Sequence, residues 1–313
     1  MVRILNIMLI TEIYNGQGLG NQIWCYTVTR TLAKDLGYKF GIQSPNKFKG
    51  LNLFPNIKEE LETITVNGGS GPEGGPPTSL PENIKHYYKE KNVFHPKYNC
   101  YINPIDTNFF RLPDNTKIDG TMQAEQYIDH RREDIKKLLH VNEDYYESKY
   151  SNKDTCILNL RGGPEYIPQH DLFLQKNYWD NAIEKMRKIN SNMKFVVITD
   201  DVNTSQEWFP DFEVRHETLE WDYSVIHNAY YTILSNTSFA WFAVWTSSKN
   251  KFCIAPKYWA RHNISDGFWS QGEALTKDWL YQDTNNNFHD YGQCKVEYEN
   301  FKHKFFEEHN IQL

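Results

Sequence analysis

One segment of the chain combines the residue types needed to bind a phosphorylated ligand and to stabilise a departing anion. Arg161 and two glycines follow the apolar stretch 155–160, which predicts a buried strand. An arginine at the carboxyl end of a strand can hold a diphosphate through two hydrogen bonds and offset negative charge on a leaving group. Asn159 lies on the same strand face as Arg161, because side chains alternate, and Glu165 is a candidate general base. A salt-bridged surface arginine remains the alternative.

A glycine-rich loop, GQGLGNQ at residues 16–22, lies between a predicted strand at 4–10 and a helical stretch that stops at Gly37. Glycine lets the backbone turn tightly and approach a ligand, and a helix N-terminus favours negative charge. The dinucleotide fingerprint fails because Asn21 replaces its third glycine, and the P-loop pattern is absent. An ordinary tight turn remains open. The candidate ligand-binding residues here are Gly18, Gly20, Asn21 and Gln22.

Two further segments carry polar groups at predicted strand ends. Asp200 and Asp201 follow the stretch 194–199 and could bind ribose hydroxyls, a guanine edge or a metal. Adjacent residues point apart on an extended backbone, so no metal-clasping pair separated by one residue is formed, and a capped helix start is the alternative. The turn at 236–239 offers a second phosphate cradle. Its candidate residues are Asn236, Ser238 and Phe239, whereas we expect the following aromatic residues to pack in the core.

The composition of the chain excludes several classes of protein. The 313 residues include 34 Lys and Arg against 40 Asp and Glu, a net charge of −6, which disfavours a nucleic-acid binder. Aromatic residues make up 15%, enough to bury a sizeable core. Five cysteines at long spacings predict neither a disulfide framework nor a structural zinc site. The N-terminal apolar run is too short to span a bilayer and lacks a cleavage site, so we expect a soluble, cytoplasmic protein without an integral membrane segment.

Strands alternate with helices in the second half of the chain. Strands are predicted at 155–160, 194–199, 212–216 and 252–256, and helices at 177–190 and 222–235, the latter capped by Asp222. This alternation predicts a parallel, doubly wound α/β sheet. Two such units, at 1–145 and 146–285, would leave a central cleft between them, with a helical tail at 286–313. The Gly- and Pro-rich segment 67–81 is predicted to be a surface loop.

Taken in order, these segments resemble the fucosyltransferases of glycosyltransferase family 11. GLGNQIWCYTVTRTLA, from Gly18, is similar to the family's GLGNQ loop and its aromatic helix, and DGTMQAEQYI (119–128) is similar to G-x-x-Q-S-E-x-Y. NLRGG (159–163), FVVITDD (195–201) and SNTSFAWFAVW (235–245) are similar to H-x-R-R-G, F-x-x-x-S-D-D and A-N-S-T-F-S-W-W. The resemblance covers most of residues 14–280, and its specificity lies in the ordered set.

The resemblance implies a GT-B enzyme with two Rossmann-like domains, the N-terminal one on the acceptor side. Such an enzyme transfers L-fucose from GDP-fucose to a sugar hydroxyl, usually as an inverting α-1,2 linkage, with no metal or other cofactor. Its partners are the nucleotide sugar and a glycan acceptor. By similarity, Arg161 would bind the diphosphate, Ser238 and the Phe239 amide would cradle it, Asn21 would hold the donor, and Asp200 or Asp201 would contact the nucleoside.

The sequence departs from the family pattern at the arginine motif. Asn159 stands where the family has histidine, and Gly162 stands where it has a second arginine. Losing a cation weakens anion binding by roughly 1–3 kcal/mol if the contact is buried. Two alternatives therefore stay open: a relative that uses another nucleotide-sugar donor, and a catalytically silent protein that binds glycans or nucleotide sugars.

Overall fold

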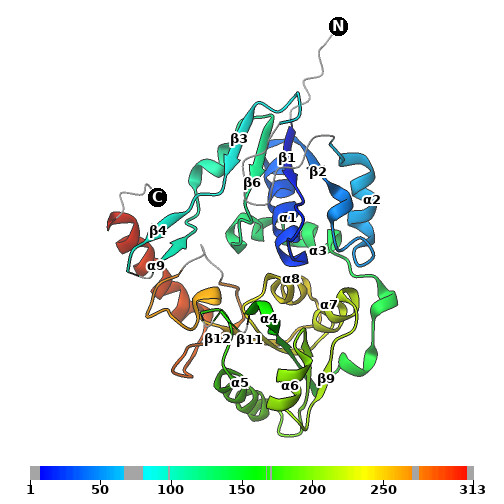
Figure 1. The fold of residues 1–313 in the computed structure, drawn as a ribbon, viewed down its shortest axis with the longest axis vertical. Helices are drawn as coiled ribbons and strands as arrows, with labels where there is room; N and C mark the ends of the chain where they lie inside the picture. Colours follow the sequence, from blue (N-terminus) through cyan, green and yellow to red (C-terminus); the bar gives the residue numbers. More distant parts are fainter. Residues whose placement is uncertain are drawn as a thin grey trace. The chain divides into compact units, whose positions relative to one another are not determined.

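The computed structural model describes residues 8–66, 80–97, 99–166, 168–169, 171–269 and 275–308, without the side chains of Pro164, Glu165 and Phe306. The predicted loop at 67–81 lies mostly outside these residues. The chain divides into two compact units: unit 1 within Met1–His95 and Tyr101–Val141, and unit 2 within Pro96–Cys100 and Asn142–Gln312 (Figure 1).

Unit 1 is built on a four-stranded parallel sheet in the order β2-β1-β6-β3. Its strands are β1 (Met8–Glu12), β2 (Lys39–Gln43), β3 (His86–Lys89) and β6 (Thr116–Asp119). The interior of β1 is fully buried at Leu9 and Ile10, as expected for a strand covered on both faces.

Helix α1 (Leu19–Leu36) connects β1 to β2 and packs against both strands. Most of its residues are buried, and it ends where Gly37 adopts a left-handed conformation, at φ +69°, that favours glycine. The predicted helix and its stop at Gly37 are confirmed. Unit 1 also contains α2 (Pro55–Ile64) and α3 (Arg132–Leu138).

Two short strands, β4 (Val93–His95) and β5 (Cys100–Ile102), form a separate two-stranded sheet. Single turns of 3₁₀ helix complete several loops. They lie at Pro45–Lys47, Thr107–Arg111, Glu125–Tyr127, Asp129–Arg131, Glu143–Tyr145, Ser148–Tyr150 and Trp259–Arg261.

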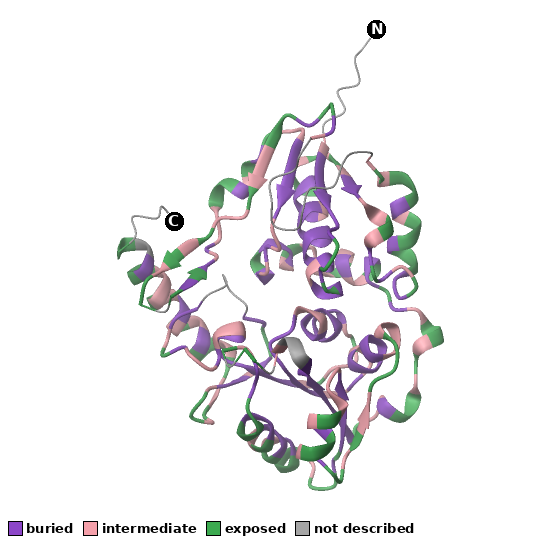
Figure 2. Ribbon diagram, viewed as in Figure 1, coloured by how far each residue is buried: buried purple, intermediate pink, exposed green. Residues whose placement is uncertain are grey.

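Unit 2 is built on a seven-stranded sheet in the order β13-β12-β11-β10-β7-β8-β9. All neighbouring strands are parallel except β12 and β13. The strands are β7 (Thr155–Leu160), β8 (Lys194–Thr199), β9 (Glu213–Arg215), β10 (Tyr231–Leu234), β11 (Phe252–Pro256), β12 (Leu280–Gln282) and β13 (Phe288–His289). The strands at the centre of this sheet are buried (Figure 2). The predicted α/β class with a parallel sheet is confirmed.

The helices that accompany this sheet in the described residues are α4 (Gly163–Tyr166), α5 (Lys176–Ile189), α6 (Val202–Trp208), α7 (Leu219–His227), α8 (Ser238–Thr246) and α9 (Tyr291–Glu308). Helix α5 shows why they form. It buries Tyr178, Trp179, Ala182, Ile183 and Met186 on one stripe at helical spacing. That stripe joins the core formed by Leu158, Val197 and Ile233 of the sheet.

The helix predicted at residues 222–235 was wrong. Residues 222–235 do not form a single helix capped by Asp222. Thr218 caps α7 by accepting a hydrogen bond from the backbone N–H of Trp221, and Asp222 lies inside the first turn. The helix ends at His227, and residues 231–234 form strand β10 at the centre of the sheet.

Candidate functional site

The order of the strands in unit 2 identifies one place where a ligand is expected. From β7 the chain proceeds outward on one side to β8 and β9, then returns to place β10 on the other side of β7. In open α/β sheets, ligands bind outside the carboxyl ends of the strands where the order reverses. Here that point lies between β7 and β10. The loops that follow them contain Arg161 and residues 235–237.

The loop after β7 is held by the acidic pair after β8. The Arg161 guanidinium forms an ion pair with Asp200, whose other carboxylate oxygen accepts the Gly162 N–H at 2.9 Å. The Gly163 N–H donates to Asp201 at 3.2 Å. Strands β7 and β8 are parallel neighbours, so their carboxyl ends bring these residues together. Arg161 also lies over the ring of Tyr166, with its Cζ 4.9 Å from the centroid.

Both glycines of this loop are required by the geometry. Gly162 is buried, and a methyl group there would lie 2.7 Å from Cβ of Asp201 and 2.8 Å from its Oδ2. Gly163 has φ +77°, in the left-handed region. The absence of a second arginine at position 162 therefore has a local cause, since the space is filled by Asp201.

Asp201 accepts a second hydrogen bond, from the first turn of helix α6. It is the N-cap of α6, where its carboxylate accepts the Thr204 N–H at 3.2 Å. Partial burial favours a higher pKa, but hydrogen bonds from Thr204 and Gly163 outweigh it and hold the pKa of Asp201 below its usual value. The helix-cap alternative thus describes Asp201, whereas Asp200 contacts the arginine loop.

Asn159 contacts the neighbouring strand end. It is 7% exposed, and its side-chain oxygen accepts the Ser235 hydroxyl at 3.0 Å. The Ser235 N–H also donates to the Asn159 carbonyl at 3.0 Å. This neutral pair fixes the end of β7 against the end of β10.

The turn after β10 contains Asn236, whose side chain is buried. Asn236 is 5% exposed and donates to the Leu172 carbonyl at 2.9 Å, while its buried Oδ1 accepts no hydrogen bond from any residue that the structure describes. Leaving such an acceptor unpaired costs about 1–3 kcal/mol, so it suits a bound group with an N–H or O–H donor.

Thr237 caps α8, the nine-residue helix that starts at this turn. Its hydroxyl oxygen accepts the N–H groups of Phe239 at 3.1 Å and Ala240 at 3.3 Å. Ser238 and Phe239 are half-buried, and Trp241, Phe242 and Trp245 are buried, which confirms the expected core packing. The Phe239 amide assigned to phosphate binding is therefore engaged by the cap.

In unit 1, the candidate loop residues are tied to their own unit. Gly18 is the exposed N-cap of α1, and Gly20 is buried within it. Asn21 accepts the side-chain amide of Gln123 at 2.7 Å. The side-chain amide of Gln22 donates to the Lys47 carbonyl at 3.0 Å and accepts the Lys49 N–H at 2.8 Å. Their role in ligand binding stays a prediction.

Glu165, the candidate base, has no described side chain, so the prediction falls outside the described residues. Sequence reasoning missed Tyr166, Ser235 and Thr237. The signal for Thr237 was available, because threonine before a helical stretch is a preferred cap. The contact of Tyr166 with Arg161 depends on the path of the loop and carries no such signal.

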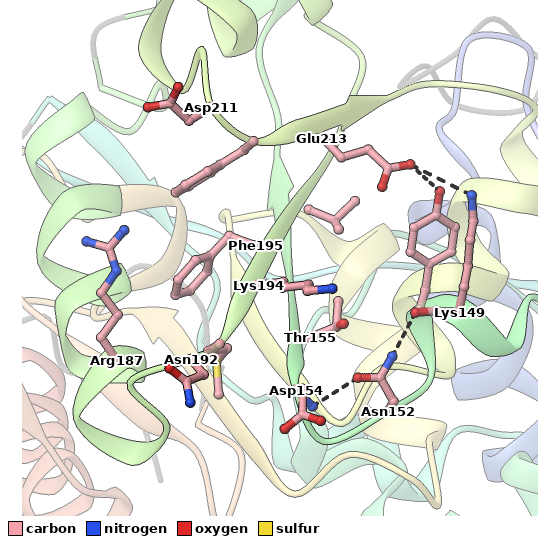
Figure 3. Close-up of a pocket in the computed structure, with 14 residues that line it drawn as sticks. Lys149, Asn152, Asp154, Thr155, Arg187, Asn192, Lys194, Phe195, Asp211 and Glu213 are labelled. Atoms are coloured by element: carbon pink, nitrogen blue, oxygen red, sulfur yellow. Dashed lines mark hydrogen bonds and ion pairs between the residues drawn. The ribbon is translucent and has the colours of Figure 1, made fainter.

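A groove of about 830 Å³ lies at the opposite, amino end of β7 and β8 (Figure 3). Thr155 and Lys194, the first residues of those strands, contribute to its lining. Its charges are mixed, with Lys149 3.8 Å from Glu213, and Tyr150 donating to Glu213 at 2.7 Å. Parallel sheets bind ligands at the other end, so this groove is not our candidate site.

None of the helices in the described part of the chain is long and apolar enough to cross a membrane. Over the same residues, no group of three or more His, Cys, Asp and Glu side chains is placed to hold a metal ion.

No protein-family model matches the chain, and no curated protein matches it in sequence. Among solved structures, it is similar to POFUT1 in complex with GDP-fucose, at 11% identity, covering 80% of this chain and 98% of that one, with a TM-score of 0.43. It is also similar to the α-1,6-fucosyltransferase NodZ soaked with GDP-fucose (13% identity, 77% and 93% covered, TM-score 0.41) and to the fucosyltransferase NodZ from Bradyrhizobium (13%, 76% and 92%, 0.42). Membership of glycosyltransferase family 11 stays a prediction.

Proposed function

We propose that the chain is a glycosyltransferase that transfers L-fucose from GDP-fucose to a glycan hydroxyl. The proposed linkage is α-1,2, formed with inversion and without a metal ion, and unit 1 takes the acceptor. The observation that carries the proposal is the position of the Arg161 loop, at the carboxyl edge of the unit 2 sheet beside its switch point. The ordered sequence resemblance supports the choice of donor.

The chemistry explains why an arginine matters there. Breaking a glycosidic bond through an oxocarbenium-like state leaves negative charge on the departing GDP. Arg161 carries a permanent positive charge in a half-exposed position and offers several N–H donors. It would hold the diphosphate before reaction and balance the charge that develops as the bond breaks.

The surroundings of Arg161 fit a nucleotide sugar in two further respects. The Arg161 guanidinium and the Gly162 N–H donate to the same carboxylate, so the loop brings two donors together as binding of a phosphate group requires. The Oδ1 of Asn236, on the adjacent strand end, has no donor among the described residues and offers an acceptor to a ligand hydroxyl or N–H. Both features favour a ligand that is both anionic and rich in hydrogen-bond donors.

The first test is thermal stabilisation by GDP, compared with UDP, ADP and CDP, in EDTA and again with Mg²⁺. A ligand that binds only the folded state raises the melting temperature, and the rise grows with the logarithm of its concentration divided by Kd. We expect a rise selective for GDP and equal in both buffers. A response only to UDP with metal, or no response to GDP, would show that the donor is misassigned.

The second test is turnover of Arg161→Ala with GDP-fucose and a panel of glycan acceptors. We expect a loss of about 100- to 1000-fold in kcat with the melting temperature preserved, because removing one donor to a developing anion has effects of that size. Arg187→Ala is the control, since Arg187 is an exposed residue of α5 that lines the amino-end groove. Unchanged turnover in Arg161→Ala would refute the leaving-group role.

A second candidate function is supported by Asn159, which stands where the resemblance expects histidine and is bonded to Ser235. This neutral pair lacks the cation of the family pattern. The second candidate is a protein that binds the nucleotide sugar without turning it over. GDP binding without transfer to any acceptor of the panel would favour this function over the first.

A further inference from the structure

The carboxylate of Asp200 accepts hydrogen bonds from the same donor groups that would bind a phosphate. One of its oxygens is paired with the Arg161 guanidinium, and the other accepts the Gly162 N–H at 2.9 Å. A phosphate oxygen bound at this loop would use a guanidinium and a backbone N–H in the same way. In this structure, those two donors are therefore engaged by an anion that belongs to the protein.

Asp201 does not share this arrangement, although it is the next residue. Its carboxylate accepts the N–H groups of Gly163 and Thr204 and caps α6. The Arg161–Asp200 ion pair is also more exposed than an ion pair that stabilises a fold. The side chains of Arg161 and Asp200 are 34% and 27% exposed, and pairs this exposed contribute little to stability. The Arg161–Asp200 pair can therefore open without disturbing the fold.

We propose that Asp200 is an internal competitor for the donor diphosphate, which pairs with Arg161 and Gly162 in the empty site and re-forms that pair as the nucleotide diphosphate leaves. This inference rests on the proposed function, and it gives Asp200 a role different from contact with the nucleoside. Binding then requires the Arg161–Asp200 pair to open first. The measured affinity is therefore the intrinsic affinity multiplied by the fraction of molecules in which the pair is open.

The competitor role has a consequence for turnover. Product release limits the rate of many enzymes, and a carboxylate that returns to the guanidinium shortens the lifetime of the bound diphosphate. Neutralising Asp200 should therefore tighten diphosphate binding in two ways, by removing the opening step from association and by slowing dissociation. Contacts to the base and ribose, which do not involve Arg161, should be unaffected.

The experiment measures binding of GDP, inorganic pyrophosphate and guanosine to the full chain by calorimetry, with GDP dissociation followed by stopped flow. The variants are Asp200→Asn, which keeps an acceptor for the Gly162 N–H but removes the charge, and Asp201→Asn as the matched control. We expect Asp200→Asn to bind GDP and pyrophosphate about 3- to 10-fold more tightly, to release GDP more slowly, and to bind guanosine as the parent does. Asp201→Asn should show neither gain.

Two results would overturn the inference. Weaker binding of GDP and guanosine together would make Asp200 a nucleoside contact, and weaker binding of GDP and pyrophosphate would make it a support that holds Arg161 in place. Asp200→Ser removes the charge and shortens the side chain. Its binding of GDP and pyrophosphate tests the inference if Asp200→Asn does not fold. Should the parent bind pyrophosphate but not GDP, the proposed donor would fail while the competition at Arg161 could still be measured.

Discussion

The side chains around Arg161 illustrate what local sequence can and cannot reveal. The arginine, the glycines and the acidic pair all stand out, because each follows an apolar stretch that reads as a buried strand. Their mutual contacts follow from pairing β7 with β8, which is a long-range feature of the fold. Sequence alone could therefore nominate Asp200 but could not distinguish a nucleoside contact from a partner of Arg161.

The glycine at position 162 gives a sharp prediction of local packing. In Gly162→Ala, the new methyl group would lie 2.7 Å from Cβ of Asp201, so the backbone of one of the two loops must move. Overpacking of this kind costs roughly 1–3 kcal/mol, and we expect the free energy of unfolding, measured by denaturant titration, to fall by that amount.

Gly18→Ala serves as the comparison, because a methyl group at Gly18 meets no atom within 4 Å. Its effect should be limited to the loss of a favoured helix-cap residue, at about 1 kcal/mol or less. An unfolding free energy for Gly162→Ala equal to that of the parent would show that the two loops are not packed as described.

Among strands and helices, the accuracy of prediction followed the clarity of the local pattern. Strands at 155–160, 194–199 and 252–256 were predicted with their observed bounds, because each contains a run of at least three consecutive apolar residues that is flanked by polar residues. The stretch 222–235 was misread, because Tyr and Ile residues recur through both α7 and β10 with no proline or glycine between them. Four residues are too few for β10 to show a period of its own.

Helix α5 provides a test of the packing that its pattern predicted. Ile183 is 4% exposed in the core beneath the sheet, whereas Ile189 of the same helix is 46% exposed. We expect Ile183→Ala to lower the free energy of unfolding by about 2–5 kcal/mol through lost burial and the cavity it leaves. Ile189→Ala should change it by no more than roughly 0.5 kcal/mol. Equal effects in the two variants, measured by denaturant titration, would contradict the assigned burial of α5.

The free energy of unfolding of the whole chain depends on pH, and the buried side chain of His262 contributes to that dependence. His262 is 2% exposed, packs edge-on against Tyr178, and donates its Nδ1–H to the Lys257 carbonyl at 3.0 Å. Burial disfavours the charged ring and lowers the pKa of His262 to about 4. Its pKa in the unfolded chain is about 6.5, so between these values the unfolded chain binds a proton that the folded chain does not.

Stability must therefore fall as the pH falls from about 6.5 to about 4, with His262 contributing about 1.4 kcal/mol per pH unit. His262→Asn retains an N–H donor near Nδ1 but cannot be protonated in this range. We expect denaturant titrations of this variant to show a shallower acid slope than the parent, whatever its absolute stability, while the exposed His140→Asn follows the parent. Parallel slopes for the parent and His262→Asn would mean that the imidazole accepts a proton in the folded state and that its surroundings are more polar than the packing against Tyr178 indicates.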